Sequence, residues 1–336
     1  MMPMKKLMNL PENYVDEMVD GFVAAHSHLV KRVPEHRRAV VRANVGDKEK
    51  VGVIIGGGSG HEPAFLGYVG DGLADGVAIG NIFASPSPDP ILAATRAVHT
   101  GKGVIYLYGN YAGDCMNFDM AAELAALEGI RVETVLVTDD AASAPPEEKH
   151  RRRGIAGDFF VFKVAGAAAD LGLSLDEVKA AAMKANEHTR TMGVALSACR
   201  LPGTDAPTFE LGPDEMEIGL GIHGEPGVRR GKLLPADEVV DQLLEKILGD
   251  MPFGDGARVA VLVNGLGSTP LSELYILYRR VHEVLSRQGI EIVRRFVGEY
   301  VTSLEMGGAS VTLMKLDDEL LRYLDHPVRT PGLVIP

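Results

Sequence analysis

The chain is poor in cysteine and lacks tryptophan. Its 336 residues include two cysteines, Cys115 and Cys199. Two cysteines cannot form a disulfide framework or a cysteine-based metal site, and this usage is typical of a protein in the reducing cytoplasm. No spacing of potential ligands predicts a metal site, so we expect this chain to bind no metal ion.

Basic residues are scarce relative to acidic ones. The sequence has 34 Lys and Arg residues against 46 Asp and Glu residues, which gives a formal net charge of −12. Nucleic acids and anionic membranes require a basic face, so this balance argues against both as partners. The run His150-Arg151-Arg152-Arg153 is the exception. We interpret it as a solvated loop, and docking of a phosphate-bearing partner is the alternative.

Long apolar runs are absent. The N-terminal residues 1–6 do not lead into an apolar stretch, because acidic residues follow at Glu12, Asp16 and Glu17. We therefore expect no signal peptide, no membrane-spanning segment, and a soluble protein of the cytoplasm.

The chain does contain enough hydrophobic residues to form the cores of two domains. Its hydrophobic content is 46%, and this content and the length together predict two α/β domains. In the first half, apolar runs typical of strands alternate with helical patterns. The predicted strands are 51–55, 76–79, 104–108 and 132–137, and the predicted helices are 90–98, 117–127, 158–171 and 174–187.

The second half repeats this alternation. The predicted strands are 191–199, 216–222, 257–263, 290–297 and 310–314, and the predicted helices are 236–248 and 271–288. The pattern indicates α/β domains with predominantly parallel or mixed sheets. We place the first domain at residues 1–190 and the second at 191–336, with residues 138–157 as a long polar loop.

Two histidines surrounded by glycines are the most informative feature. His223 lies in Gly-Ile-His-Gly-Glu-Pro-Gly at 221–227, and His61 lies in Gly-Gly-Gly-Ser-Gly-His-Glu-Pro at 56–63. Glycine permits unusual backbone angles and leaves room for a ligand to approach. Both histidines are therefore candidate functional residues.

The element around His61 follows a predicted buried strand. Ligands of open parallel sheets bind beyond the carboxyl ends of such strands, so we expect His61 to face a cleft. A P-loop would need Lys before Ser or Thr, and a dinucleotide fingerprint would need a third glycine; neither pattern fits. The glycines are expected to form a turn whose amides receive a small polar molecule. A tight turn with a surface histidine is the alternative.

A carboxylate occupies a comparable position after another predicted strand. Asp114 ends the element Gly-Asn-Tyr-Ala-Gly-Asp at 109–114, just before the helix predicted at 117–127. Amides at a helix N-terminus favour an ionised carboxylate, so Asp114 could act as a base. A helix-capping or turn-forming role is the alternative.

These elements together resemble the substrate-binding subunit of dihydroxyacetone kinases. The resemblance runs in order through nearly the whole chain. Besides the two histidine elements and Asn-Tyr-x-Gly-Asp, it includes Thr-Pro-Leu-Ser-Glu-Leu-Tyr (269–275), Tyr-Val-Thr-Ser-Leu (300–304) and the closing Thr-Pro-Gly (330–332).

The resemblance implies a mechanism. In this family a histidine captures the carbonyl carbon of a short-chain ketose as a covalent hemiaminal, which selects ketones over the similar polyol glycerol, and His223 matches that histidine. An aspartate and a second histidine assist removal of the proton from the attacking hydroxyl, and these map onto Asp114 and His61. Since these residues come from both halves, we expect the site at the domain interface. The implied substrate-binding residues are Gly58, Ser59, Gly60, Gly109 and Asn110.

Position 109 departs from the family pattern. Family members that act on dihydroxyacetone commonly carry a lysine just before the Asn-Tyr pair, whereas this chain has Gly109. Losing a long cationic side chain removes a hydrogen-bond donor and leaves space. A four-carbon ketose such as erythrulose is therefore a second candidate substrate. The alternative is that a neighbouring side chain fills the gap.

The resemblance also implies partners. This chain shows no nucleotide motif and ends at Pro336, where single-chain relatives continue into a nucleotide-binding domain. We therefore expect a separate nucleotide-binding subunit that carries Mg²⁺ and ADP or ATP and is recharged by ATP exchange or by a phosphotransferase-system protein. The resemblance implies a homodimer as well.

Two functions of other classes stay open. One is a non-catalytic ketose-binding coactivator, because the resemblance implies that relatives of this subunit can bind the same ketose and act as regulatory coactivators. The presence of His61, Asp114 and His223 together favours the enzyme, since binding alone requires no base. Aldolase- or isomerase-type chemistry is the weaker alternative, because no lysine occupies a comparable glycine-rich position.

Overall fold

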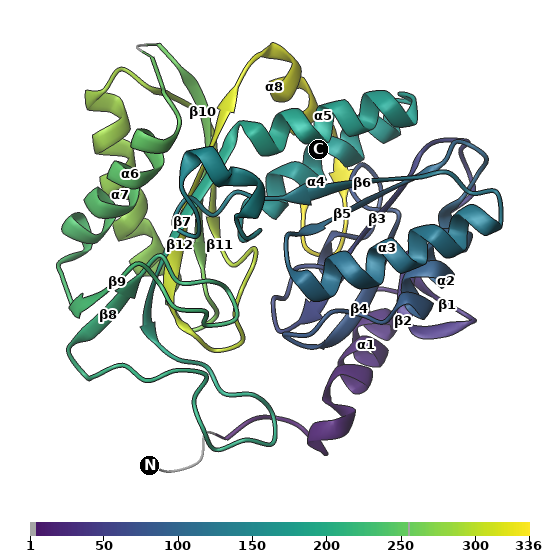
Figure 1. Ribbon diagram of the computed structural model, residues 1–336, viewed down its shortest axis with the longest axis horizontal. Coiled ribbons are helices and arrows are strands. Elements are labelled where there is room, and N and C mark those ends of the chain that lie inside the picture. The colour runs from purple at the N-terminus through teal and green to yellow at the C-terminus, as the bar shows by residue number, and fades with distance from the viewer. Residues whose placement is uncertain (1–4, 255) are drawn as a thin grey trace. The chain divides into compact units, whose positions relative to one another are not determined.

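The computed structural model describes residues 5–254 and 256–336 (Figure 1). The described chain divides into two compact units. Unit 1 contains the residues up to Val137, Phe160–Ala185 and Leu320–Pro336, and unit 2 contains Thr138–Phe159 and Asn186–Glu319. These units differ from the predicted division at residue 190. The segment 138–159 groups with the second unit, and the closing segment groups with the first.

Unit 1 is built on a six-stranded mixed sheet with the strand order β1-β2-β4-β3-β5-β6. Neighbours among β3, β4, β5 and β6 run parallel, and β1 and β2 add antiparallel. The central strands β3 and β5 are buried throughout, as expected for a sheet covered on both faces. The strands are β1 Val30–Val33, β2 His36–Arg42, β3 Gly52–Ser59, β4 Gly76–Ile82, β5 Val104–Gly109 and β6 Val132–Val137.

The four strands predicted in this half are confirmed, but β3 is longer than expected because it continues through the glycines to Ser59. A Cβ on Gly56 would lie 2.5 Å from the carbonyl oxygen of Ala78, and one on Gly58 would lie 2.6 Å from the backbone nitrogen of Ala84. The prediction of a glycine turn is therefore wrong for these residues. They are strand residues that allow close approach of a neighbouring backbone.

Helices cover the unit 1 sheet. Ile91 and Phe118, from two of these helices, pack with Ile54, Tyr106 and Tyr108 of the sheet in one core. Among the described helices, none is long and apolar enough to span a bilayer. The helices are α1 Tyr14–Ala25, α2 Pro88–Val98, α3 Ala112–Leu127, α4 Asp158–Asp170 and α5 Leu175–Glu187, with short 3-10 turns η1 Pro11–Asn13 and η2 Leu66–Tyr68. A further 3-10 helix, η3 Pro146–Arg151, belongs to unit 2.

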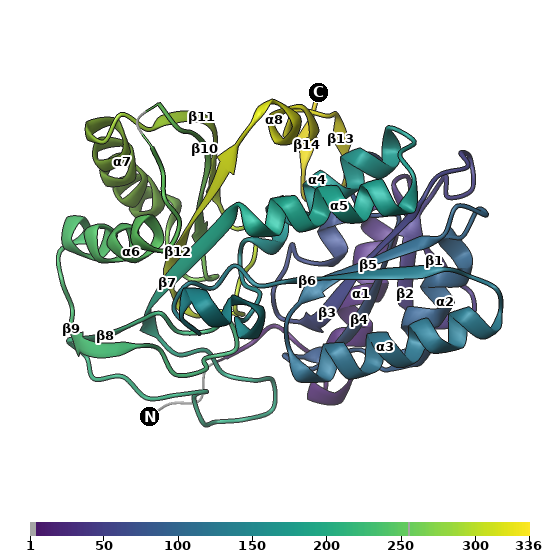
Figure 2. The same cartoon turned by 45° about the horizontal axis from the view of Figure 1, so that its top comes forward.

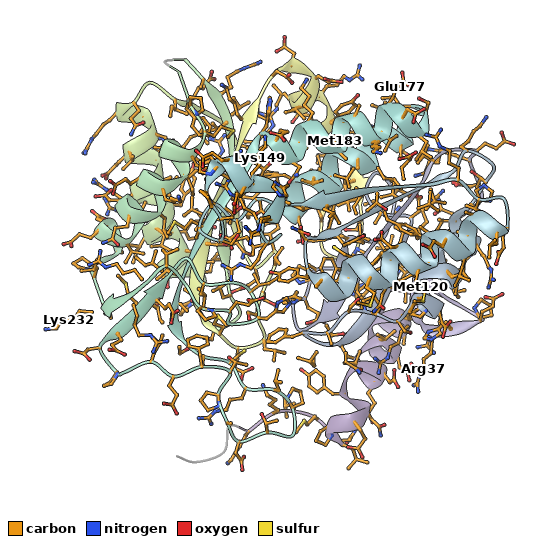
Figure 3. The ribbon with its side chains drawn as sticks, in the orientation of Figure 1. Arg37, Met120, Lys149, Glu177, Met183 and Lys232 are labelled. Carbon is orange, nitrogen blue, oxygen red and sulfur yellow. The ribbon has the colours of Figure 1, made fainter. Side chains whose placement is uncertain are left out.

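The helix α3 begins earlier than the predicted start at residue 117. Its exposed face carries apolar side chains: Met116 is 66% exposed and Met120 is 48% exposed. Figure 3 shows Met120 pointing away from the ribbon. Because apolar residues lie on both the buried and the exposed faces, amphipathic periodicity could not mark where this helix starts.

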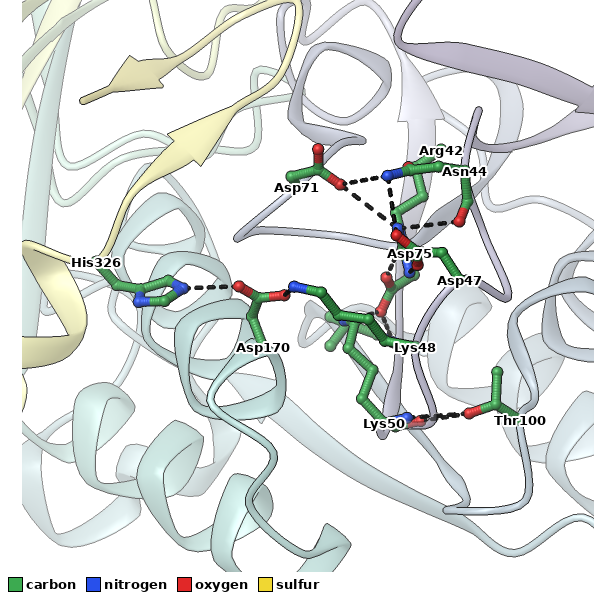
Figure 4. Close-up of polar contacts among 11 residues, drawn as sticks. Arg42, Asn44, Asp47, Lys48, Lys50, Asp71, Asp75, Thr100, Asp170 and His326 are labelled. Atoms are coloured by element: carbon green, nitrogen blue, oxygen red, sulfur yellow. Dashed lines mark hydrogen bonds and ion pairs between the residues drawn. The ribbon is translucent and has the colours of Figure 1, made fainter.

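A buried ion-pair network joins β2, β4 and the start of β3 (Figure 4). Asp75 accepts hydrogen bonds from Nε of Arg42 at 2.7 Å, Nζ of Lys50 at 2.6 Å and the backbone N–H of Val53 at 2.9 Å. Arg42 also donates to Asp47 at 2.7 Å. The buried carboxylate of Asp75 thus has the partners that its desolvation requires.

Unit 2 contains a second six-stranded mixed sheet with the order β11-β10-β12-β7-β8-β9. Only β10 and β11 pair in parallel within this described sheet. Helices α6 Ala236–Asp250 and α7 Leu271–Arg287 share an apolar core with it. The strands are β7 Thr189–Ser197, β8 Glu215–Ile218, β9 Arg229–Lys232, β10 Arg258–Gly265, β11 Glu291–Gly298 and β12 Gly307–Leu316.

The closing segment of the chain belongs to unit 1 from residue 320 onward. Helix α8, Asp318–Leu324, leads into a small antiparallel hairpin of β13, Val328–Arg329, and β14, Val334–Ile335. Figure 2 shows both strands close to α8 and the C-terminus. This hairpin was not predicted in the sequence analysis.

Candidate functional site

His61 follows the end of β3 and is 1% exposed. Its ring stacks on Phe83 with 5.1 Å between centroids and meets the edge of Phe65 at 6.3 Å. Phe83 has a φ of 55°, a left-handed conformation that costs free energy in a residue with a side chain. The two rings fix the plane of the imidazole. His61 is therefore not the surface histidine of the alternative interpretation.

The residues next to His61 are held by local hydrogen bonds. The backbone N–H of Gly60 donates to both carboxylate oxygens of Glu62, at 3.2 and 3.1 Å. The hydroxyl of Ser59 donates to the carbonyl of Gly80 at 2.9 Å. Burial raises the pKa of Glu62, although the amide of Gly60 acts in the opposite direction. The predicted contacts of Gly58, Ser59 and Gly60 with substrate stay a prediction.

Asp114 is the third residue of α3, and 9% of its surface is exposed. The N-cap of this helix is Tyr111, so the alternative in which Asp114 caps the helix is wrong. Burial raises the pKa of the Tyr108 phenol, and the nearby groups of Cys115, Asp119 and Asp114 raise it further. Asp114 therefore lies in the first turn of α3. Its negative charge is one of the charges that keep the phenol of Tyr108 neutral.

Gly109 and Asn110 lie where β5 ends. Gly109 is buried, and its carbonyl accepts the backbone N–H of Tyr111 at 2.8 Å. The thiol of Cys115 donates to Oδ1 of Asn110 at 3.6 Å. Because β3 and β5 are parallel neighbours, the elements of His61 and Asp114 follow the same edge of the unit 1 sheet.

His223 lies in unit 2, in the loop that follows β8 rather than directly at the end of a strand as predicted. Its side chain is 21% exposed, and Nδ1 lies 2.8 Å from Oε1 of Glu225. The backbone N–H of His223 donates to the other oxygen of Glu225 at 3.0 Å. Burial would raise the pKa of Glu225, but the hydrogen bond and charge of His223 lower it to about 2. In the tautomer that carries its proton on Nδ1, the imidazole donates a hydrogen bond to this carboxylate and its lone pair lies on Nε2.

Arg153 supports the same loop. It donates to Oδ2 of Asp140 at 2.8 Å and to the carbonyl of Gly219 at 3.1 Å. A Cβ on Gly221 would collide with the carboxylate of Glu225 and would lie 2.7 Å from Nη1 of Arg153. Gly221 is therefore needed for the close approach of the guanidinium and the carboxylate. The sequence did not single out Arg153 or assign a role to Glu225, although the spacing of His223 and Glu225 was a signal.

A second contact holds the backbone just before His223. The hydroxyl of Ser303 donates to the carbonyl of Ile222. Asn264 supports the segment that carries Ser303, because its side-chain amide donates to the carbonyl of Val301 at 2.7 Å. The element Tyr-Val-Thr-Ser-Leu was noted in the sequence without a role, and in the structure it supports the histidine loop.

The arginine run is not a uniformly solvated loop. Arg152 is fully buried and donates to both carboxylate oxygens of Asp250, at 2.7 and 2.6 Å. Arg190 donates to the same carboxylate at 2.6 Å. The solvated interpretation is therefore wrong for Arg152 and Arg153, while Arg151 is exposed. The run contributes to the structure of unit 2.

The predicted site residues therefore fall into two groups, one in each unit. Within residues 5–254 and 256–336, no three His, Cys, Asp or Glu side chains lie together in a way that could hold a metal ion. The prediction that the two groups form one site stays a prediction.

Comparison with known families identifies the chain. The Dak1 domain matches residues 20–332. The chain belongs to the Dak1 domain family. The subunit named PTS-dependent dihydroxyacetone kinase 2, dihydroxyacetone-binding subunit DhaK, from Listeria innocua is 52% identical to it, over 98% of each chain.

Other Dak1 relatives are longer or have other functions. L-erythrulose 1-kinase from Mycolicibacterium smegmatis is 47% identical over 98% of this chain, which spans 58% of that protein. The solved dihydroxyacetone kinase from C. freundii, in complex with AMP-PNP and Mg²⁺, has 35% identity and a TM-score of 0.90 over 99% of this chain and 61% of its own.

The solved dihydroxyacetone kinase operon co-activator Dha-DhaQ has 34% identity and a TM-score of 0.89, over 95% of this chain and 98% of its own. The solved relatives share the mixed α/β fold, so the predicted fold class is confirmed.

Proposed function

We propose that this chain is the substrate-binding and catalytic subunit of a short-chain ketose kinase. It holds the ketose on His223 while a separate nucleotide-binding subunit supplies the phosphoryl group. The pairing of His223 with an ionised Glu225 carries this proposal, in a chain 52% identical to a dihydroxyacetone-binding subunit. This arrangement supports a nucleophilic nitrogen at Nε2.

The first step is addition of His223 to the ketose. The lone pair of Nε2 forms a bond to the carbonyl carbon as the π bond of the carbonyl opens, and the carbonyl oxygen takes a proton from water to become the hemiaminal hydroxyl. Positive charge grows on the imidazole as this bond forms. The carboxylate of Glu225, 2.8 Å from Nδ1, stabilises that charge and accepts a hydrogen bond from the Nδ1–H group while staying ionised. Glycerol has no carbonyl carbon and cannot be captured in this way.

The second step is phosphoryl transfer to a primary hydroxyl of the captured ketose. That hydroxyl must lose its proton as it attacks phosphorus, and a positioned base contributes about 10²–10⁴-fold to the rate. Asp114 acts as this base and His61 assists it. The partner subunit brings the nucleotide and Mg²⁺, and the metal ion neutralises the charge that develops on the phosphates.

The capture step is tested by ketose soaking. Intact-mass and electron-density measurements should show a bond between the ketose and Nε2 of His223. His223→Ala should lose the adduct, whereas the exposed His282→Ala should retain it. A fully occupied ligand held only by hydrogen bonds would contradict the proposal.

The proton-transfer step is tested with the partner subunit. Asp114→Asn should keep the adduct but reduce kcat by about 10²-fold or more, because a base is lost. His61→Asn should weaken both capture and turnover. An Asp114 variant that turns over at the parental rate would remove its assignment as the base.

Erythrulose is the second candidate substrate, and Gly109 favours it. A lysine at this position would donate a charge-assisted hydrogen bond to a substrate hydroxyl and shorten the pocket. Such a bond is worth about 1.5–3 kcal/mol, which corresponds to about a 10- to 100-fold change in rate ratio. Gly109→Lys should raise kcat/KM for dihydroxyacetone relative to erythrulose by that factor.

The matched control is Gly109→Ala, which adds a side chain without charge. Side-by-side kinetics of the two ketoses with the parent and both variants decide the point. An unchanged ratio in Gly109→Lys would show that this residue does not face the substrate, and dihydroxyacetone would then be the preferred substrate.

We also infer that the chain forms a homodimer, which sedimentation would test.

A non-catalytic coactivator is the competing function, supported by the likeness to Dha-DhaQ. The combined presence of His61, Asp114 and His223 favours the kinase, because a coactivator needs no base. Absence of turnover with ATP-linked and phosphotransferase-system partners, together with intact ketose capture, would favour the coactivator.

A further inference from the structure

The closing Thr-Pro-Gly element forms the turn of the β13–β14 hairpin. Thr330 is 2% exposed. Its backbone N–H donates to the carbonyl of Leu333 at 2.9 Å, and its hydroxyl accepts the backbone N–H of Leu333 at 3.0 Å. The side chain of Thr330 therefore holds the turn in one shape.

This turn lies against the loop that follows His61. The backbone N–H of Gly332 donates to the carbonyl of Gly67 at 2.7 Å. A Cβ on Gly332 would lie 2.9 Å from that carbonyl oxygen and 3.0 Å from Cβ of Pro63. The backbone N–H of Gly67 in turn donates to the carbonyl of Pro63 at 2.7 Å. Gly332 thus contacts both ends of the short segment that begins two residues after His61.

Two further glycines, Gly70 and Gly72, leave room for the backbone at the start of the hairpin. A Cβ on Gly70 would collide with the carbonyl oxygen of Arg329, and one on Gly72 would collide with that of Pro327. The backbone N–H of Arg329 donates to the carbonyl of Asp71 at 3.0 Å. The segment after His61 is therefore shaped to receive the hairpin along its length.

The segment that leads from α8 into the hairpin is anchored to α4. Nζ of Lys163 donates to the carbonyl of Tyr323 at 2.6 Å. Nε2 of His326 lies 2.9 Å from Oδ2 of Asp170, a pair drawn in Figure 4. The same helix carries Phe162, which packs against Phe65 with 6.0 Å between ring centroids. Phe65 is one of the two rings that hold the imidazole of His61.

We propose that the hairpin turn positions His61 for proton transfer through the contact of Gly332 with Gly67 and Pro63. The inference rests on the proposed function, in which His61 assists loss of the hydroxyl proton. His61 is buried and only two residues from Pro63, so a displaced Pro63 moves the imidazole. A misplacement of about 1 Å can cost about 10²-fold in rate. Gly332 and Thr330 act through His61 and are positioning residues.

The test compares Gly332→Ala with Val334→Ala in the full chain, assayed with the partner subunit. Val334 lies on the same hairpin and is 71% exposed, so its variant should behave as the parent. Gly332→Ala should lower kcat by about 10- to 100-fold. The imidazole NMR signals of His61, assigned with His61→Asn, should shift in Gly332→Ala and stay unchanged in Val334→Ala.

A double-mutant cycle separates positioning from general damage. In the His61→Asn background, Gly332→Ala should cause no further loss of kcat, because the residue through which it acts is gone. An equal loss in both backgrounds would overturn the inference, as would unchanged His61 signals in Gly332→Ala. If His61→Asn turned over at the parental rate, the proposed role of His61 would fail, while the NMR signals would still report whether the turn positions the ring.

If Gly332→Ala fails to fold, variants of Thr330 test the same positioning of His61. Thr330→Val removes the hydroxyl that accepts the N–H of Leu333, whereas Thr330→Ser keeps it. The valine variant should shift the His61 signals and lower kcat, and the serine variant should restore both. Equal behaviour of the two variants would overturn the inference.

Discussion

In the proposed mechanism, Glu225 determines which nitrogen of His223 acts as the nucleophile. Its carboxylate contacts both Nδ1 and the backbone N–H of the same residue, at 2.8 and 3.0 Å. One side chain therefore sets the orientation of the ring and the position of its proton. Arg153, which approaches Glu225 across Gly221, adds to the lowering of the pKa of Glu225.

Replacement of Glu225 tests this role. Glu225→Gln should weaken ketose capture by about 10-fold or more, because a neutral amide stabilises the growing imidazolium less than a carboxylate does. Since the pKa of Glu225 is about 2, the carboxylate stays ionised above about pH 4, and the loss should be the same across the neutral range. Titration of adduct formation by intact mass measures this. The exposed Glu210→Gln serves as the control, and equal capture by the Glu225 variant would contradict the role.

Among the residues, the sequence analysis singled out His61, Asp114 and His223 as candidates, whose roles stay predictions, and it missed the side chains that hold the His223 loop. His61, Asp114 and His223 stand in short elements whose neighbours are local, so a linear pattern was sufficient to find them. Arg153 reaches the His223 loop from a distant part of the sequence. Contacts between distant segments leave no local periodicity, and a single sequence does not reveal them.

Among the structural elements, the segment between β6 and α4 departs most from expectation. It was predicted as a polar loop, yet it carries Arg152, whose side chain is fully buried against Asp250. Arg190 completes the group. A buried carboxylate held by two guanidinium groups requires both partners, because removing one leaves charge without compensation.

Arg152→Met should therefore destabilise unit 2. Loss of one partner from a buried ion pair typically costs about 3–5 kcal/mol. Urea unfolding followed by circular dichroism measures the change, and the neighbouring exposed Arg151→Met should change stability little. A variant of Arg152 with parental stability would show that Arg190 alone satisfies Asp250.

The elements also show where periodicity succeeds and fails. The strands β3 to β6 are apolar runs of ordinary length, and they were found. The extension of β3 through Gly56 to Gly58 was missed because glycine normally marks turns, whereas here the close backbone of Ala78 and Ala84 requires it. The start of α3 was missed because its apolar residues do not follow one face.

On the scale of the whole chain, the sequence predicted the fold class but not how the chain is shared between units. Both sheets are mixed, as expected. The return of residues 320–336 to unit 1 depends on contacts such as that of Lys163 with Tyr323, which lie far apart in the sequence. Helix and strand patterns are local and therefore predict elements better than their assembly.

Lys163 connects the closing segment of the chain with α4, and its burial predicts that the free energy of unfolding depends on pH. Its side chain is fully buried, and Nζ donates to the carbonyl of Tyr323 at 2.6 Å. Burial lowers its pKa to about 7, although the charges of Asp325 and Asp170 act in the opposite direction. In the unfolded chain a lysine has a pKa of about 10.4. Between these values the unfolded chain binds more protons than the folded chain, so this residue makes stability rise with pH in that window.

Lys163→Met should remove this pH dependence. The free energy of unfolding of the parent, minus that of the variant, should increase from about pH 7 to about pH 10 by up to about 1.4 kcal/mol per pH unit, and it should level off below pH 7 where both states are protonated. Urea unfolding at a series of pH values measures the difference. Lys102→Met, at a side chain that is 57% exposed, should give a difference that does not change with pH. A constant difference for Lys163 as well would show that its ammonium group stays charged in the folded protein, held by the carbonyl of Tyr323 and by Asp170 and Asp325.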